Sequence, residues 1–171
     1  MKKSLIGLFL LFIVLPVGAR STLEVAPKVS YYYGDSDLFT GSNIGLAGDI
    51  LYNPTNSFGI RITLLETIFG DNTIFLLNSR NAIDALFYIP IRGLKTYLNT
   101  SISITSIEGI TDFWLGGGIG LEYYMGGGKK LFLEPNLLFT TVGIYDRVFW
   151  FRLSLGLKFK VIEWKNSNIP Y

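Results

Sequence analysis

Residues 148–161 read VFWFRLSLGLKFKV, and this stretch decides the fold of the chain. Every second residue from Phe149 to Val161 is apolar, and the residues between them are mainly polar or small. An alternation with a period of two residues indicates a β-strand with two unlike faces. Globular strands are usually about 5–6 residues long, whereas a tilted strand needs about 9–11 residues to cross a bilayer. The stretch therefore predicts a membrane-spanning strand whose apolar face meets lipid.

The same alternation recurs seven times upstream. It predicts strands over residues 22–33, 43–52, 57–67, 81–91, 96–105, 112–125 and 130–142. Longer links at 34–42, 68–80, 106–111 and 143–147 alternate with tight turns at 53–56, 92–95 and 126–129. An even number of strands lets the first pair with the last, which removes both sheet edges. The predicted fold class is all-β, an eight-stranded antiparallel up-and-down transmembrane β-barrel.

Three prolines fall inside these predicted strands, at Pro27, Pro90 and Pro135. Proline cannot donate a ladder hydrogen bond, and a closed barrel offers no free edge where the missing donor is harmless. We therefore expect a bulge or a strand end at each proline.

The N-terminus has the pattern of a cleaved signal peptide over residues 1–19. Lys2 and Lys3 precede an apolar run, and small residues end it; an uncleaved anchor is the alternative. Cleavage leaves a single barrel domain over residues 20–171 with a short C-terminal tail, carrying 13 basic and 13 acidic residues. This zero net charge gives no basic field for nucleic acid.

The chain contains no cysteine and no histidine. Lipoprotein acylation, disulfides, histidine-based catalysis and histidine metal ligation are therefore excluded. We expect no enzymatic activity and no cofactor.

The chain resembles the small eight-stranded outer-membrane β-barrel family of Gram-negative-type bacteria (OmpX- and OmpA-like barrels). The likeness covers residues 22–161, and its sharpest feature is the insertion signal of the last strand, in which Ser154, Gly156, Phe159 and Val161 fit the spacing polar, any, Gly, any, any, apolar, any, apolar. The resemblance implies a location in the bacterial cell outer membrane. It implies outer-membrane lipid and the barrel assembly machinery as partners, and it implies no single activity.

Alternation alone does not say which face points outward. A soluble lipocalin-like barrel, with apolar residues inside, has the same pattern. The polar face here is rich in Gly, Ser and Thr and poor in Lys and Glu, unlike a solvated surface. The composition therefore favours membrane insertion, with the polar face in the lumen.

The inward face carries charges of both signs, and the candidate lumen ion network consists of Lys28, Asp49, Arg61, Asp84, Glu122, Glu134, Arg152 and Lys158. Asp49 is expected to pair with Lys28 and Arg61, and Lys158 with Glu134. Glu122 and Glu134 are expected to face each other across a tight turn, where they could form an acid–base pair. We favour a buried ion network that plugs the lumen, because an unpaired buried charge is costly.

Gly116, Gly118 and Gly120 share the inward face of one predicted strand. A phosphate-binding loop would need a helix after the glycines, and none is predicted. We interpret these glycines as a side-chain-free track that gives space to Tyr97 or Arg152.

The function favoured by these patterns is that of a non-enzymatic barrel with a structural or surface-interaction role through its outer loops. The segment 68–80 is too apolar for an open loop, so Ile74, Phe75, Leu76 and Leu77 are predicted as an interaction site for an unknown surface partner. The alternative is a carrier that binds a small apolar ligand in its lumen between Leu86, Tyr88, Trp114, Phe132, Leu138 and Trp150.

Overall fold

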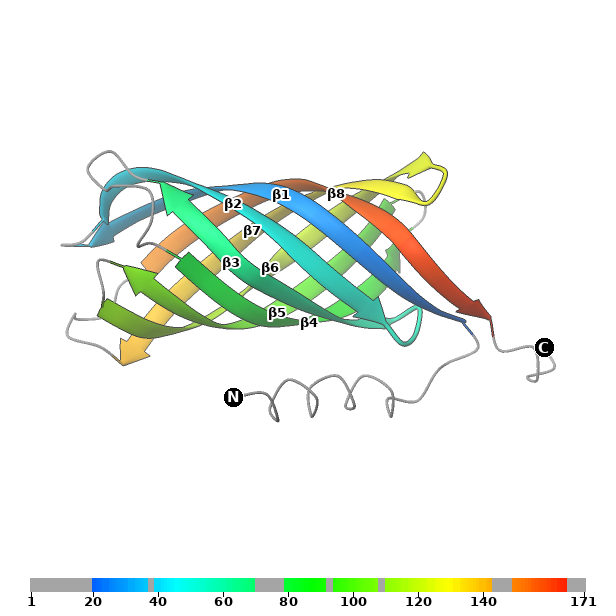
Figure 1. Ribbon diagram of the computed structural model, residues 1–171, viewed down its shortest axis with the longest axis horizontal. Helices are drawn as coiled ribbons and strands as arrows, with labels where there is room; N and C mark the ends of the chain where they lie inside the picture. The colour runs from blue at the N-terminus through cyan, green and yellow to red at the C-terminus, as the bar shows by residue number, and fades with distance from the viewer. Residues whose placement is uncertain are drawn as a thin grey trace.

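The computed structural model describes residues 20–36, 39–69, 79–91, 94–107, 110–142 and 149–165. They form eight strands: β1 (Arg20–Ser36), β2 (Phe39–Asn53), β3 (Phe58–Phe69), β4 (Ser79–Ile91), β5 (Leu94–Ile107), β6 (Ile110–Gly126), β7 (Lys129–Val142) and β8 (Phe149–Lys165). Each strand pairs antiparallel with its neighbours in sequence, and β1 pairs with β8 to close the barrel (Figure 1). The predicted fold class is confirmed.

The barrel has two distinct ends (Figure 1). The turn end contains the start of β1, the end of β8, the β2–β3 turn and the β6–β7 hairpin. The opposite end, here called the loop end, contains the ends of β3 and β7 and the starts of β4 and β8. The predicted signal peptide and the predicted interaction site at Ile74, Phe75, Leu76 and Leu77 lie outside the described residues.

Two of the predicted loops are wrong, because the strands extend further at the loop end. β1 and β2 remain paired as far as Ser36 opposite Phe39. β5 and β6 remain paired as far as Ile107 opposite Ile110. The segments 34–42 and 106–111 are mainly polar and have turn propensity, so their sequence resembles a loop. In their described parts, 34–36, 39–42, 106–107 and 110–111, strand pairing satisfies the backbone N–H and C=O groups, and this pairing does not require apolar side chains.

The barrel wall is apolar on the outside and polar on the inside. The side chains of Leu46, Ile83, Ile102 and Leu137, on four different strands, are all more than half exposed. Arginine, lysine, aspartate and glutamate side chains are buried in the lumen instead. The soluble alternative, with an apolar lumen and a polar exterior, is therefore wrong. In the described part of the chain, no helix is long and apolar enough to cross a membrane.

The expectation of a bulge or strand end at each proline holds only for Pro90, one residue before the end of β4. The registers of β1 with β8 and of β6 with β7 continue unchanged past Pro27 and Pro135. At both sites the proline carbonyl approaches a lumen-facing glycine of the adjacent strand, Gly156 or Gly118, so closely that a Cβ there would collide with it. The sheet thus accommodates each proline by a close approach of two backbones rather than by a bulge.

A bulge that the alternation did not predict occurs in β3. The register between β3 and β4 shifts between Thr63 and Glu66, so that Leu64 and Leu65 both face outward. Leu65 adopts a positive φ of 52°, which is strained for a residue with a side chain. Its amide donates a hydrogen bond to Asn81 Oδ1 at 2.9 Å. The bulge reverses the inward and outward positions beyond it and so turns Glu66 into the lumen.

Candidate functional site

The middle of the lumen is filled by a central ion cluster of four acidic and four basic side chains: Lys28, Asp49, Arg61, Glu66, Arg80, Asp84, Glu134 and Arg152. Each is at most 5% exposed. The formal charges within the cluster cancel. This matters because an unpaired charge in a buried environment is very unfavourable.

Arg61 and Glu134 are the hub of the central ion cluster. The guanidinium of Arg61 donates to both carboxylate oxygens of Glu134, at 2.6 and 2.8 Å, and to Asp84 at 2.5 Å. Glu134 also accepts hydrogen bonds from the Tyr97 hydroxyl at 2.6 Å and from Arg152 at 3.1 Å. Such bidentate, charge-assisted contacts hold planar groups in one orientation. Residues of β3, β4, β5, β7 and β8 are thereby joined across the bore.

Two further groups extend the cluster toward the loop end and the β1–β2 wall. The Lys28 ammonium lies 2.8 Å from Asp49, whose carboxylate also accepts a hydrogen bond from Thr63. Arg80 donates to Glu66 at 2.9 Å. Asp49 lies 3.7 Å from Arg61, as a looser partner than Lys28.

The central ion cluster contains six of the eight candidate network residues and two that sequence reasoning missed. Glu66 was missed because the β3 bulge changes which residues face inward. Arg80 was missed because the predicted strand began at residue 81, whereas β4 begins at Ser79. The sequence feature that could have identified Arg80 is its position as a basic residue directly before a predicted strand. No signal in the alternation marks the bulge itself.

The other two candidates belong to a separate lower cluster near the turn end, made of Glu24, Glu122, Lys130 and Lys158. Lys158 donates to Glu122 at 2.6 Å, and Lys130 donates to Glu24 at 2.7 Å. Lys130 was missed because it lies next to the predicted turn.

The structure does not bring Glu122 and Glu134 opposite each other. Gly126 already pairs with Lys129, and a register shift follows, so Glu122 lies opposite Phe132. Glu134 lies two residues further from the turn and belongs to the central ion cluster. Lys158 likewise contacts Glu122 rather than Glu134. The expected pairs of Glu122 with Glu134 and of Lys158 with Glu134 are therefore wrong. The register shift in the β6–β7 hairpin places Glu122 opposite Phe132, and the β7–β8 register places Lys158 opposite Lys130.

Two apolar layers alternate with the ionic ones. The layer nearer the turn end, here called the lower layer, includes Leu51, Leu86, Tyr88, Tyr97 and Phe132. The layer nearer the loop end, here called the upper layer, consists of Tyr32, Ile68, Trp114, Leu138 and Trp150. The six residues proposed to hold an apolar ligand are thus divided between the layers: Leu86, Tyr88 and Phe132 in one, Trp114, Leu138 and Trp150 in the other. They do not line one cavity.

The glycine track on β6 is filled by side chains of neighbouring strands. A Cβ at Gly120 would lie inside the ring of Tyr97, and one at Gly116 would collide with Leu138. The track therefore seats large lumen side chains, as predicted for Tyr97, and Arg152 is not among the nearest neighbours of these glycines.

Gly120→Ala should destabilise the barrel strongly, because Tyr97 must leave its position and its hydrogen bond to Glu134 is lost with it. We expect a cost of about 2–4 kcal/mol in denaturant unfolding, from overpacking together with the lost bond. Gly48→Ala is the matched control, since nothing lies within 4 Å of a Cβ at that position. Equal unfolding midpoints for the two variants would contradict this packing.

The residues of the predicted insertion signal lie on β8. Ser154 and Gly156 face the lumen, and Ser154 shares a 2.9 Å hydrogen bond with Ser30. Phe159 is partly buried, and Val161 is 57% exposed. Val161 is the extra residue of a bulge, because Lys160 pairs with Glu24 and Ile162 pairs with Leu23. Recognition of these residues by the assembly machinery stays a prediction.

The chemistry available in the lumen is that of paired charges. The carboxylate of Glu134 accepts hydrogen bonds from four side chains: Arg61, Arg152, Tyr97 and Asn136. These hydrogen bonds occupy the lone pairs of the carboxylate. Within the described ranges, no group of three or more potential ligands could hold a metal ion. The arrangement is suited to filling and bracing the barrel.

Solved structures with the same architecture are similar to this chain along most of its length. Neisserial surface protein A is 16% identical, with a TM-score of 0.57, over 84% of this chain and 100% of that chain. The N-terminal β-barrel domain of Pseudomonas aeruginosa OprF is 17% identical, with a TM-score of 0.58, over 81% and 97%. A designed transmembrane β-barrel is 15% identical, with a TM-score of 0.53, over 82% and 95%.

These comparisons show the fold. The chain has the fold of small eight-stranded transmembrane β-barrels, so the resemblance predicted from its sequence is confirmed at the level of the fold. No protein-family model and no curated protein sequence matches the chain.

Proposed function

We propose that the protein is an integral β-barrel of the bacterial outer membrane whose closed lumen braces the wall, and that it has a non-enzymatic, structural or surface-interaction role through its loop end. The single observation that carries this proposal is the central ion cluster. Its eight charged side chains are buried, paired and joined across the bore.

A closed lumen restricts where function can lie. The interior of an eight-stranded barrel is just wide enough for side chains or one small ligand. Here two ionic clusters and two apolar layers fill it. The surfaces left for partners are the two ends and the exposed apolar wall, which supports outer-membrane lipid as one partner.

The orientation of the barrel follows the usual asymmetry of such proteins. Periplasmic turns are short and outer loops are longer. The turn end would then face the periplasm and the loop end would face the exterior. As part of the same proposal, the apolar segment with Phe75 and Leu76, which connects β3 to β4 in the sequence, would face the exterior, where a partner or the lipid headgroups could contact it.

A combined insertion and conductance measurement tests this proposal. Chain refolded into vesicles should run on a gel with different mobility before and after boiling, as an intact barrel does. The same vesicles, fused to a planar bilayer, should show no stepwise conductance above that of protein-free vesicles. Stable single-channel steps from the unboiled band would overturn the closed-lumen proposal, and the absence of a heat-modifiable band would overturn the membrane barrel itself.

A further inference from the structure

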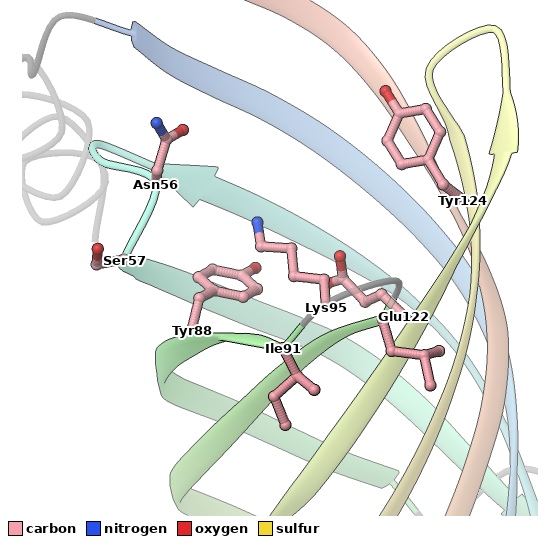
Figure 2. Close-up of a pocket in the computed structure, with 8 residues that line it drawn as sticks. Asn56, Ser57, Tyr88, Ile91, Lys95, Glu122 and Tyr124 are labelled. Atoms are coloured by element: carbon pink, nitrogen blue, oxygen red, sulfur yellow. The ribbon is translucent and has the colours of Figure 1, made fainter.

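A pocket of about 440 Å³ opens at the turn end, beside the lower cluster. It is formed by the β2–β3 turn and strands β4, β5 and β6, and Figure 2 shows the turn residues on one side and Tyr124 on the other. Its polar lining consists of Asn56, Ser57, Tyr88, Lys95, Glu122 and Tyr124.

Among the described residues that line this pocket, Lys95 is the cation, and its surroundings differ from those of the other inward-facing lysines. Its ammonium lies 3.6 Å from the centre of the Tyr88 ring. Lys28, Lys130 and Lys158 have a carboxylate oxygen at 2.8, 2.7 and 2.6 Å. Among the residues that the structure describes, Lys95 has no carboxylate within salt-bridge distance. Its positive charge is left facing the pocket.

The charges around the pocket leave a positive surplus. In the described part of the chain, three lysines (Lys95, Lys130 and Lys158) stand against two glutamates, Glu24 and Glu122. Glu122 is already shared by Lys158 at 2.6 Å and Lys130 at 3.5 Å. The carboxylate in the pocket lining is thus neutralised by other partners, so an incoming anion meets the Lys95 ammonium.

The remaining lining supplies polar and apolar contacts. Asn56 and Ser57 are exposed at the pocket edge and carry an amide and a hydroxyl that can donate hydrogen bonds. The Tyr88 hydroxyl already donates to Asn53 at 2.9 Å, so its ring acts as the platform for Lys95. Ile91 and Leu94 line the same pocket and are 54% and 45% exposed.

We propose that this pocket binds a phosphate group, carried by an anionic phospholipid or free in solution, through the Lys95 ammonium with Asn56 and Ser57 as hydrogen-bond donors. Lysine binds phosphate as a point charge, and basic pockets at membrane surfaces bind lipid head groups. Exposed Ile91 and Leu94 offer an acyl chain or glycerol backbone an apolar contact. This proposal goes beyond the proposed function, since it concerns a site outside the closed part of the lumen.

The test uses the full refolded chain in a non-ionic maltoside detergent, titrated with inorganic phosphate and, separately, with dihexanoyl phosphatidylglycerol. Backbone amide chemical shifts of Lys95, Tyr88 and Tyr124 report binding. Lys95→Gln should weaken binding by about tenfold or more, the effect of losing one charged partner. Lys129→Gln is the matched control, because Lys129 is exposed on the β6–β7 hairpin and does not line the pocket.

The outcomes distinguish a site for free phosphate from a site for a lipid head group, and they include results that would overturn the proposal. Saturable shifts with both probes that are lost in Lys95→Gln support a site for free phosphate. Saturable shifts with the lipid alone, lost in the same variant, support a lipid head-group site. Absence of saturable shifts with either probe, or equal weakening by Lys95→Gln and Lys129→Gln, would overturn the proposal. Heat-modifiable mobility of each variant verifies folding independently of binding.

Discussion

Leu155→Arg should prevent insertion of the chain into a bilayer, whereas Ser154→Ala, at the adjacent residue, should permit it. Leu155 is 46% exposed on the outer wall near the middle of β8, whereas Ser154 is fully buried in the lumen. A charged side chain on the lipid face near the bilayer midplane costs about 2–4 kcal/mol. Loss of the hydrogen bond between Ser154 and Ser30 costs only about 1 kcal/mol.

Refolding into lipid vesicles, followed by gel mobility without boiling, measures the difference. The folded fraction of Leu155→Arg should fall far below that of Ser154→Ala at equal lipid concentration. Leu153→Arg should behave like Leu155→Arg, because residues two apart share one face. If the arginine and alanine variants fold to the same extent, the assignment of the lipid and lumen faces to β8 is wrong.

The sequence was sufficient to predict the eight strands and their two faces because the alternation is a local property. Each residue in a spanning strand meets either lipid or lumen, so its polarity reflects its own environment. Leu155 and Ser154 could therefore be assigned without knowing any partner strand. The strand ends were less accurate. Residues such as Gly34 and Thr111 are polar or small and have turn propensity, yet they lie within paired strands.

The partners of the lumen charges could be predicted only where the two charges lie on adjacent strands whose register is not shifted by a bulge. Asp49 lies opposite Ala26, two residues along β1 from Lys28, and Asp49 and Lys28 do form the expected ion pair. The contact of Arg61 with Glu134 joins β3 to β7 across the bore. It depends on the diameter of the closed barrel, which no local pattern records. A bulge such as the one at Leu65 adds a further shift that only the assembled sheet reveals.

Arg61→Ala should destabilise the barrel by about 3–5 kcal/mol, the usual cost of removing one partner from a buried ion network. Arg61 is fully buried and directly contacts Asp84 and Glu134. Its removal leaves three basic residues against four acidic ones in the central ion cluster. The loss is larger than that of a single hydrogen bond, because the remaining carboxylates cannot reach water to be solvated.

Urea unfolding in vesicles, monitored by tryptophan fluorescence, gives the free energies for Arg61→Ala, Asp84→Ala and the double variant. Lys129→Ala is the exposed control and should change stability by less than about 0.5 kcal/mol. In the double variant the cluster again contains equal numbers of acidic and basic groups. Its total loss should therefore be smaller than the sum of the two single losses. Strict additivity, or an Arg61→Ala midpoint equal to that of Lys129→Ala, would show that the central ion cluster does not act as a coupled network.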